Sequence, residues 1–122
     1  MKFYICSHCG NIITFMNDKG VPVMCCGEKM QELKAGVTDA AAEKHVPATT
    51  VKDGEAVVEV GSVAHPMTAE HYIEWIVLET SCGTYIRRLS PNDAPKAFFK
   101  LHSEEKVTAT YAYCNLHGLW KA

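Results

Sequence analysis

A thiol and an imidazole lie close together near the end of the sequence, in Cys114-Asn115-Leu116-His117. With this spacing, both side chains can bind one metal ion from a single turn of backbone. They supply only two ligands, so the others must come from upstream, where His45, His65 and His71 stand in short polar segments. A closed zinc site takes four ligands, whereas these five leave one octahedral position open for a substrate. The set therefore predicts a catalytic iron centre, with zinc as the alternative ion.

A second group of candidate ligands consists of four thiols in two pairs, Cys6-x-x-Cys9 and Cys25-Cys26. Two thiol pairs of this kind are typical of a tetrathiolate metal site. Because Cys25 and Cys26 are adjacent, both can reach one ion only if the backbone bends between them. Thiolates bind both zinc and iron, and an iron bound by sulfur would be a one-electron redox centre. A structural zinc site and a disulfide between the adjacent cysteines remain alternatives.

The other histidines and the sixth cysteine are interpreted as bystanders. His8 lies inside the first thiol loop, where four sulfurs already complete a site. His102 stands in a charged turn region, and Cys82 stands in a predicted turn between two strands. None of the three is expected to bind a metal.

Length and composition indicate a small globular protein. The 122 residues are 48% hydrophobic and 21% charged, which suits one domain, or a small domain plus a metal-stapled module. The net charge of -2 does not indicate a basic surface that would bind nucleic acid. No apolar run approaches the roughly 20 residues that are needed to cross a bilayer. Residues 1–6 show no signal-peptide segment, so we expect a cytoplasmic protein. In that reducing compartment, six cysteines favour metal ligands over disulfides.

Two parts are predicted along the chain, residues 1–36 and residues 37–122. The first is a cysteine-rich module with two short β-type runs, and Gly36 marks the linker that follows it. A segment this short cannot fold on apolar burial alone. A metal ion or a partner chain must therefore hold it together.

The second part is predicted to be an antiparallel β-sandwich. One helical turn, capped by Thr38 or Asp39 and stopped by Pro47, should precede the strands. Short strands separated by turn residues, without alternating helices, favour a sandwich. Runs rich in β-branched and aromatic residues predict strands at 57–60, 72–78, 84–86, 97–101 and 107–113.

At this point the motifs resemble those of the desulfoferrodoxins, the two-iron class of superoxide reductase, over almost the whole chain. Cys6-x-x-Cys9 with Cys25-Cys26 resembles the family's desulforedoxin-like module, here residues 1–36. The resemblance implies that residues 37–122 form an immunoglobulin-like catalytic β-sandwich domain. The motifs similar to those of that domain are Glu43-Lys44-His45-Val46-Pro47, the segment from His65 to His71, and Cys114-Asn115-Leu116-His117-Gly118.

The resemblance also implies two iron ions per chain. Cys6, Cys9, Cys25 and Cys26 would bind an Fe(Cys)4 centre, where zinc can take the place of iron. The other ion would occupy a square-pyramidal Fe(His)4Cys centre with Cys114 as its axial ligand. Its equatorial ligands would be His45, His65, His71 and His117.

The implied activity is the one-electron reduction of superoxide to hydrogen peroxide at the ferrous His4Cys centre. An external donor such as rubredoxin would re-reduce the iron, and the chain would form a homodimer. Lys44, next to His45, would attract superoxide and orient a proton-donating water. By resemblance, Glu43 would become a sixth ligand of the oxidised iron and help to expel peroxide. The alternative for Glu43 and Lys44 is a solvated surface pair.

Two other classes of function remain open on the sequence alone. One is an electron carrier or metal-stabilised binding module without catalysis, and the other is a superoxide dismutase. A reductase forms peroxide without dioxygen and stops when its reductant is exhausted, so an assay of products separates these classes.

Overall fold

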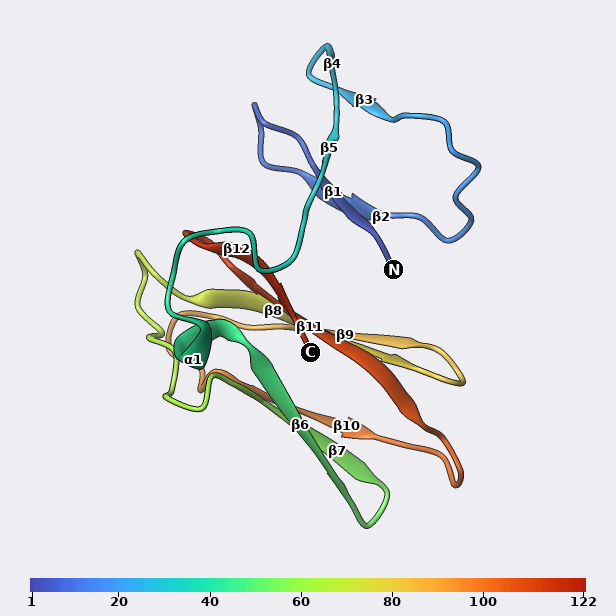
Figure 1. Ribbon diagram of the computed structural model, residues 1–122, viewed down its shortest axis with the longest axis vertical. Coiled ribbons are helices and arrows are strands. Elements are labelled where there is room, and N and C mark those ends of the chain that lie inside the picture. The colour runs from blue at the N-terminus through green and yellow to red at the C-terminus, as the bar shows by residue number, and fades with distance from the viewer. The chain divides into compact units, whose positions relative to one another are not determined.

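The computed structural model describes residues 1–122 and consists of short strands and one helical turn (Figure 1). The chain forms two compact units, Met1–Lys34 and Ala35–Ala122. Its only helix, α1 (Ala42–His45), has four residues, so no helix is long enough to span a bilayer.

The first unit contains a three-stranded sheet and a separate hairpin. In the sheet, β1 (Phe3–Ile5) lies between β2 (Ile12–Thr14) and β5 (Gln31–Glu32), and all its pairs are antiparallel. The hairpin joins β3 (Met24–Cys25) to β4 (Glu28–Lys29). The side chains of this unit that are buried are Phe3, Cys6 and Met30. So small a core agrees with the expectation that apolar burial alone does not hold the module.

The second unit is an antiparallel sandwich of two sheets, which face one another in Figure 1. The three-stranded sheet has the order β10-β7-β6, with bounds Lys96–Lys100, Glu55–Val60 and Pro47–Lys52. The four-stranded sheet has the order β12-β11-β8-β9, with bounds Gly118–Lys121, Val107–Cys114, Ile73–Thr80 and Thr84–Arg88. Alternating side chains of both sheets form the core: Ala56, Val58, Val60, Ile73, Ile76, Leu78, Ala97, Phe99, Ala112 and Cys114.

The predicted fold class, a mainly β chain with an antiparallel sandwich, is confirmed. Two strands of the sandwich went unpredicted. β6 (Pro47–Lys52) is an edge strand that begins with proline and is mostly exposed, and β12 (Gly118–Lys121) has only four residues. The predicted helix cap was wrong, because Ala41 occupies the N-cap position and no side chain caps α1.

A buried carboxylate, Glu105, links the β8–β9 hairpin to the turn before β11. Its Oε1 accepts hydrogen bonds from the hydroxyls of Thr80 (2.5 Å) and Tyr85 (2.8 Å). Its Oε2 accepts one from the backbone N–H of His102 (2.8 Å). These bonds, led by that of Thr80, favour the ionised form and hold the pKa of Glu105 below its usual value. His102 therefore contributes its backbone N–H to the fold.

The sandwich gathers three connecting segments at one end, and these carry the predicted ligands (Figure 1). They are α1, the loop between β7 and β8, and the turn between β11 and β12. Cys114 is the last residue of β11 and pairs with Gly118 of β12 on one side and with Ile73 of β8 on the other. The Cys-x-x-His motif thus begins at the end of β11 and forms the hairpin turn to β12.

Candidate metal centres

Four histidine side chains form a square at this end of the sandwich. Ring centroids of neighbours around the square are 4.6 Å (His45–His65), 4.6 Å (His65–His71), 5.0 Å (His71–His117) and 4.9 Å (His117–His45) apart. Neighbouring ring planes are inclined by 76° to 87°. His45 and His71, on a diagonal, are 6.3 Å apart and inclined by only 31°. The four imidazoles therefore surround one common centre.

Backbone carbonyls determine which ring nitrogen of two histidines faces this centre. His45 Nδ1 is 2.7 Å from the carbonyl oxygen of Ala41, and His65 Nδ1 is 2.7 Å from that of Pro66. A carbonyl oxygen can only accept, so each Nδ1 carries the proton and each Nε2 presents a lone pair. At His117, Nδ1 faces the other rings instead.

The inward nitrogens have the spacing of ligands around one ion. His45 Nε2 lies 3.2 Å from His65 Nε2 and 3.0 Å from His117 Nδ1. Two nitrogens at right angles, each about 2.1 Å from a shared metal, would be about 3.0 Å apart. With both Nδ1 atoms protonated, His45 and His65 direct lone pairs at each other, which is unfavourable unless a cation lies between them. His71 Nε2 is buried and has no hydrogen-bond partner. These residues fit a bound metal ion.

Cys114 supplies a fifth donor outside the square. Its sulfur is 3.8 Å from His117 Nδ1, and the donor atoms of Cys114, His45, His65 and His71 lie within 4.8 Å of one another. Its side chain is completely buried, and burial raises the pKa of the thiol, although backbone N–H groups of Leu116 and His117 oppose this. A cation in the square would favour the thiolate.

Burial also favours the uncharged, metal-binding form of three of the imidazoles, those of His45, His65 and His71. It lowers the pKa of His65 to about 4 and lowers those of His45 and His71 as well. The positive charge of Lys44 acts in the same direction on His45 and His71. Neutral imidazole is the metal-binding form of histidine.

Asn115 ties the loop of His71 to the turn that carries Cys114 and His117. Its side-chain amide donates to the carbonyl of Glu70 (3.0 Å) and accepts from the backbone N–H of Tyr72 (3.0 Å). These two residues flank His71, so one side chain fixes the position of the loop on both sides of the ligand. The sequence interpretation missed this role, for which the only signal was an amide inside the Cys-x-x-His motif.

Gly61 allows the loop after β7 to pack closely against α1. Its N–H donates to the Val46 carbonyl (3.1 Å), and the Val63 N–H donates to the Glu43 carbonyl (3.0 Å). The φ angle of Gly61 is +84°, and a Cβ there would lie 2.7 Å from the Lys44 carbonyl oxygen. Only glycine fits this position without strain. The contact holds α1 and its ligand His45 against the loop that carries His65.

Glu43 and Lys44 project from α1 into solvent directly before the buried His45. Neither forms a side-chain hydrogen bond or ion pair that would hold it away from an incoming molecule. The side chains of His71 and His117 are only half-buried, whereas His45 is 2% exposed. The square is therefore nearer to solvent at His71 and His117 than at His45.

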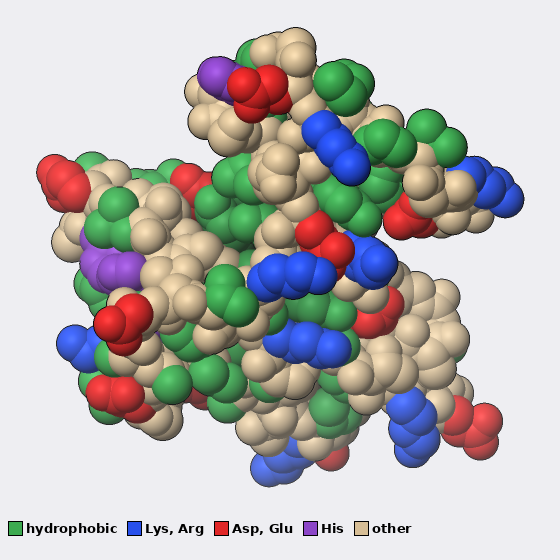
Figure 2. Space-filling view, turned by 45° about the horizontal axis from the view of Figure 1, so that its top comes forward, with side chains coloured by type: hydrophobic (Ala, Val, Ile, Leu, Met, Phe, Trp, Pro, Cys, Tyr) green, Lys and Arg blue, Asp and Glu red, His purple; other side chains and the backbone are tan.

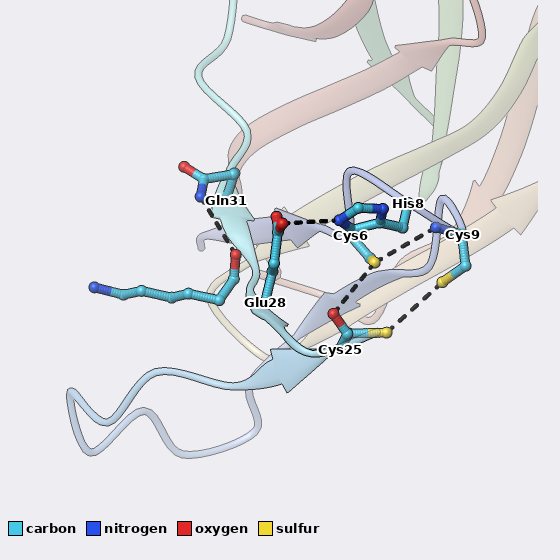
Figure 3. Close-up of polar contacts among 7 residues, drawn as sticks. Cys6, His8, Cys9, Cys25, Glu28 and Gln31 are labelled. Atoms are coloured by element: carbon cyan, nitrogen blue, oxygen red, sulfur yellow. Dashed lines mark hydrogen bonds and ion pairs between the residues drawn. The ribbon is translucent and has the colours of Figure 1, made fainter.

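The four thiols of the first unit form a separate cluster, with ligand atoms within 4.8 Å of one another. Cys9 Sγ and Cys25 Sγ are 3.6 Å apart (Figure 3). Sulfurs about 2.3 Å from a tetrahedral ion would be separated by about 3.8 Å. Cys26, with φ of 52°, provides the bend that the adjacent pair requires. All four cysteines are free thiols, so the structure contains no vicinal disulfide.

The acid–base properties of these thiols also suit a cation. Hydrogen bonds from the backbone N–H groups of Cys9 and His8 lower the pKa of Cys6 to about 6. Hydrogen bonding with Cys9 and Cys6 raises the pKa of Cys25, and it raises that of Cys26 to about 12. One thiolate forms readily and further ones are disfavoured, unless a metal ion compensates their charge.

Two of the three presumed bystanders lie at the surface with local partners. His8 Nε2 is 3.0 Å from Glu28 Oε1, which links the first thiol loop to β4 (Figure 3). Cys82 is exposed in the turn between β8 and β9, 3.8 Å from the hydroxyl of Ser81. Neither belongs to a metal-binding cluster of this structure.

Comparison with known proteins agrees with this arrangement. The family model described as "Desulfoferrodoxin" matches residues 37–122. A desulfoferrodoxin of Nitratidesulfovibrio vulgaris is 46% identical over 121 residues, which are 99% of this chain and 94% of the relative. The chain belongs to the desulfoferrodoxin family. It matches the crystal structure of the superoxide reductase from Treponema pallidum with a TM-score of 0.83 and 38% identity, over 98% of both chains.

A second relative, the superoxide reductase of Thermococcus kodakarensis, is 36% identical in an alignment that covers 75% of this chain and 92% of the relative. The family that the histidine and cysteine motifs suggested is therefore the family to which the chain belongs.

Proposed function

We propose that this chain is a superoxide reductase, which reduces superoxide by one electron to hydrogen peroxide. The observation that carries the proposal is the square of four imidazoles with a buried thiol as fifth donor. A structural zinc site is closed by four ligands, whereas five donors leave one position of an octahedron for a small anion. The names of the relatives support the same activity.

We assign His45, His65, His71, His117 and Cys114 as the residues that would hold the iron. A ferrous ion in this set would supply the single electron and the open coordination position that the reaction needs. Iron is preferred over zinc because zinc has no redox chemistry. The Cys114 thiolate would donate electron density to that metal, as the thiolate does in thiolate-ligated haem.

Lys44 attracts the substrate and helps to deliver protons. The reduction consumes one electron and two protons for each superoxide, and the exposed ammonium of Lys44 stands beside the ligand His45. On the face drawn in Figure 2, acidic and basic side chains are interspersed instead of segregated by sign. A local cation next to the site is therefore a better source of attraction than an extended charged surface.

Glu43 acts after the reduction. Its carboxylate repels an incoming anion, so it cannot help superoxide to bind. Its position two residues before His45, on the exposed side of α1, would let this carboxylate bind the oxidised iron and help to expel peroxide.

Residues 1–36 form a tetrathiolate iron module in this proposal, and residues 37–122 form the catalytic domain. Thiolate-bound iron is a one-electron centre, and zinc can replace it where the module serves structure alone. The external donor is a rubredoxin-like protein, and free thiols at both centres suit the reducing cytoplasm.

We further propose a homodimer. The first unit buries few side chains and leaves large apolar ones in solvent, including Met16 (97% exposed), Val21 (70%) and Met24 (61%). A partner chain would cover such residues. Sedimentation analysis should then give twice the mass of the chain, and a single-chain mass would contradict the dimer.

The kinetic test of the proposed site compares Lys44→Ala with Glu43→Ala in the reduced protein. Lys44→Ala should slow the reaction with superoxide by about ten- to a hundredfold and reduce its dependence on salt. Glu43→Ala should preserve or slightly raise that rate, because it removes a repulsive charge, and should change the optical spectrum of the oxidised protein. An unchanged rate and salt dependence in Lys44→Ala, measured by pulse radiolysis, would leave Lys44 as an ordinary surface residue.

A further inference from the structure

Trp120 is a large side chain behind the histidine square to which the proposed mechanism assigns no role. It lies on β12 opposite Ala112 of β11, and Ala112 belongs to the sandwich core. Residues paired across two antiparallel strands share a face of the sheet. Trp120 therefore points inward, and only 4% of it is exposed.

The indole contacts two adjacent corners of the square. Its ring stacks on His45, with centroids 4.8 Å apart and planes inclined by 27°. Its Nε1–H donates a hydrogen bond to the backbone carbonyl of His117 (3.2 Å). His45 Nε2 and His117 Nδ1 are neighbouring inward nitrogens, 3.0 Å apart. One rigid side chain thus acts on both members of a ligand pair.

We infer that Trp120 is a positioning residue of the metal centre, which fixes the tilt of His45 and the backbone of His117. The inference rests on the proposed metal centre. The bond from His45 Nδ1 to Ala41 restrains one atom of the ring, but the χ2 torsion of histidine is broad, so the ring can still tilt about that bond. A flat indole on its face removes this freedom. Groups that orient metal ligands typically change metal affinity by about 10- to 100-fold when they are lost.

The contact should strengthen when a metal binds. Coordination withdraws electrons from the imidazole, and an electron-rich indole face attracts an electron-poor ring. The buried indole also excludes water from the back of His45. Both effects oppose release of the metal, so the rate of release is the appropriate measurement.

The simpler alternative is that Trp120 only fills space in the core. Leu119 provides a matched control, because it is the preceding residue of β12, is 5% exposed, and pairs with Tyr113, so it lies on the other face of the sheet. Leu119→Ala should lower stability without touching the square. If Trp120 only filled space, the rate of metal release would rise in step with the loss of stability in both Trp120→Leu and Leu119→Ala.

The test measures transfer of ferrous iron from the full-length, metal-loaded protein to a chelator, under anaerobic conditions in which every variant is folded by circular dichroism. Trp120→Leu should release iron from the histidine centre about 10- to 100-fold faster than the unaltered protein. Trp120→Phe, which retains an aromatic face but loses the hydrogen bond, should fall between the two. Leu119→Ala should release iron at the unaltered rate.

Fluorescence gives a second readout that does not depend on activity. The chain has two tryptophans, Trp75 and Trp120. In metal-free Trp75→Phe, addition of ferrous iron should quench the remaining emission of Trp120 strongly, since its ring contacts a ligand. In Trp120→Phe, the emission of Trp75 should fall by a smaller fraction.

Equal release rates for Trp120→Leu and the unaltered protein, or equal acceleration by Leu119→Ala, would overturn the inference while leaving the proposed function intact. Equal quenching of the two tryptophans would also count against the contact. An unaltered protein that takes up no iron at the histidine square would instead refute the proposed function, and this inference with it.

Discussion

Replacing Gly61 by alanine should loosen the attachment of α1 and its ligand His45. Gly61 has φ of +84°, and a Cβ at this position would contact the carbonyl oxygen of Val63 and lie 2.7 Å and 2.8 Å from those of Lys44 and Glu43. All three are backbone atoms, which cannot move aside as a flexible side chain can. The left-handed conformation costs alanine about 1–2 kcal/mol, and forcing packed backbone apart costs about 1–3 kcal/mol more. We therefore expect Gly61→Ala to lower the free energy of unfolding by about 2–5 kcal/mol.

Urea denaturation of the metal-free protein measures this loss, and Gly54→Ala provides its control. Gly54 also has a positive φ, +73°, but a Cβ there would meet only the carbonyl oxygen of Leu101, at 3.8 Å. Gly54→Ala should therefore show the conformational cost alone, about 1–2 kcal/mol. Gly61→Ala should also lower iron occupancy of the histidine centre, whereas Gly54→Ala should not. Equal losses of stability in the two variants would refute the close approach of the loop to α1.

Three further predictions concern the thiols and a buried carboxylate. Cys114→Ser should remove the thiolate-to-iron charge-transfer band of the oxidised protein, and Cys82→Ser should leave it intact. Loss of the band in Cys82→Ser would mean that Cys114 is wrongly assigned as the thiolate ligand. Cys9→Ser should damage only the first centre, so a folded variant that no longer reacts once with superoxide would disprove separate roles. The lowered pKa of Glu105 means that its carboxylate stabilises the fold above pH 4.5 and that this contribution disappears as the pH falls through the folded-state pKa. Glu105→Gln should lower the urea midpoint at pH 7 and flatten its decline in acid, and an unchanged acid profile would show that other groups cause it.

The inner strands of the sandwich were predictable from residue type, and so were the edge strands β9 and β10, but the edge strands β6 and β12 were not. The runs predicted at 72–78 and 107–113 correspond to β8 and β11, the two inner strands of the four-stranded sheet. β6 has an exposed, polar pattern after its first residue, and its pairing with β7 comes from tertiary context. Edge strands of this kind carry little hydrophobic periodicity for a sequence to display.

The sequence also indicated which histidines and cysteines should lie together, but not how they are held. Residue spacing carries no information on the choice between Nδ1 and Nε2, because that choice depends on which backbone carbonyl lies beside each ring. The amide bridge of Asn115 and the stacking of Trp120 link residues that are far apart in sequence. Such contacts become visible only when the loops at the end of the sandwich are placed.

The stoichiometry of superoxide consumption tests the central claim most directly. Reduced, iron-loaded protein without further reductant should convert one superoxide per histidine centre to one hydrogen peroxide, release no dioxygen, and then stop. Addition of a reductant should restart the reaction. A dismutase would continue without reductant and would release one dioxygen for each peroxide, and an electron carrier or binding module would form no peroxide at this centre. Either result would contradict the proposal that the square of histidines with Cys114 is the site of superoxide reduction.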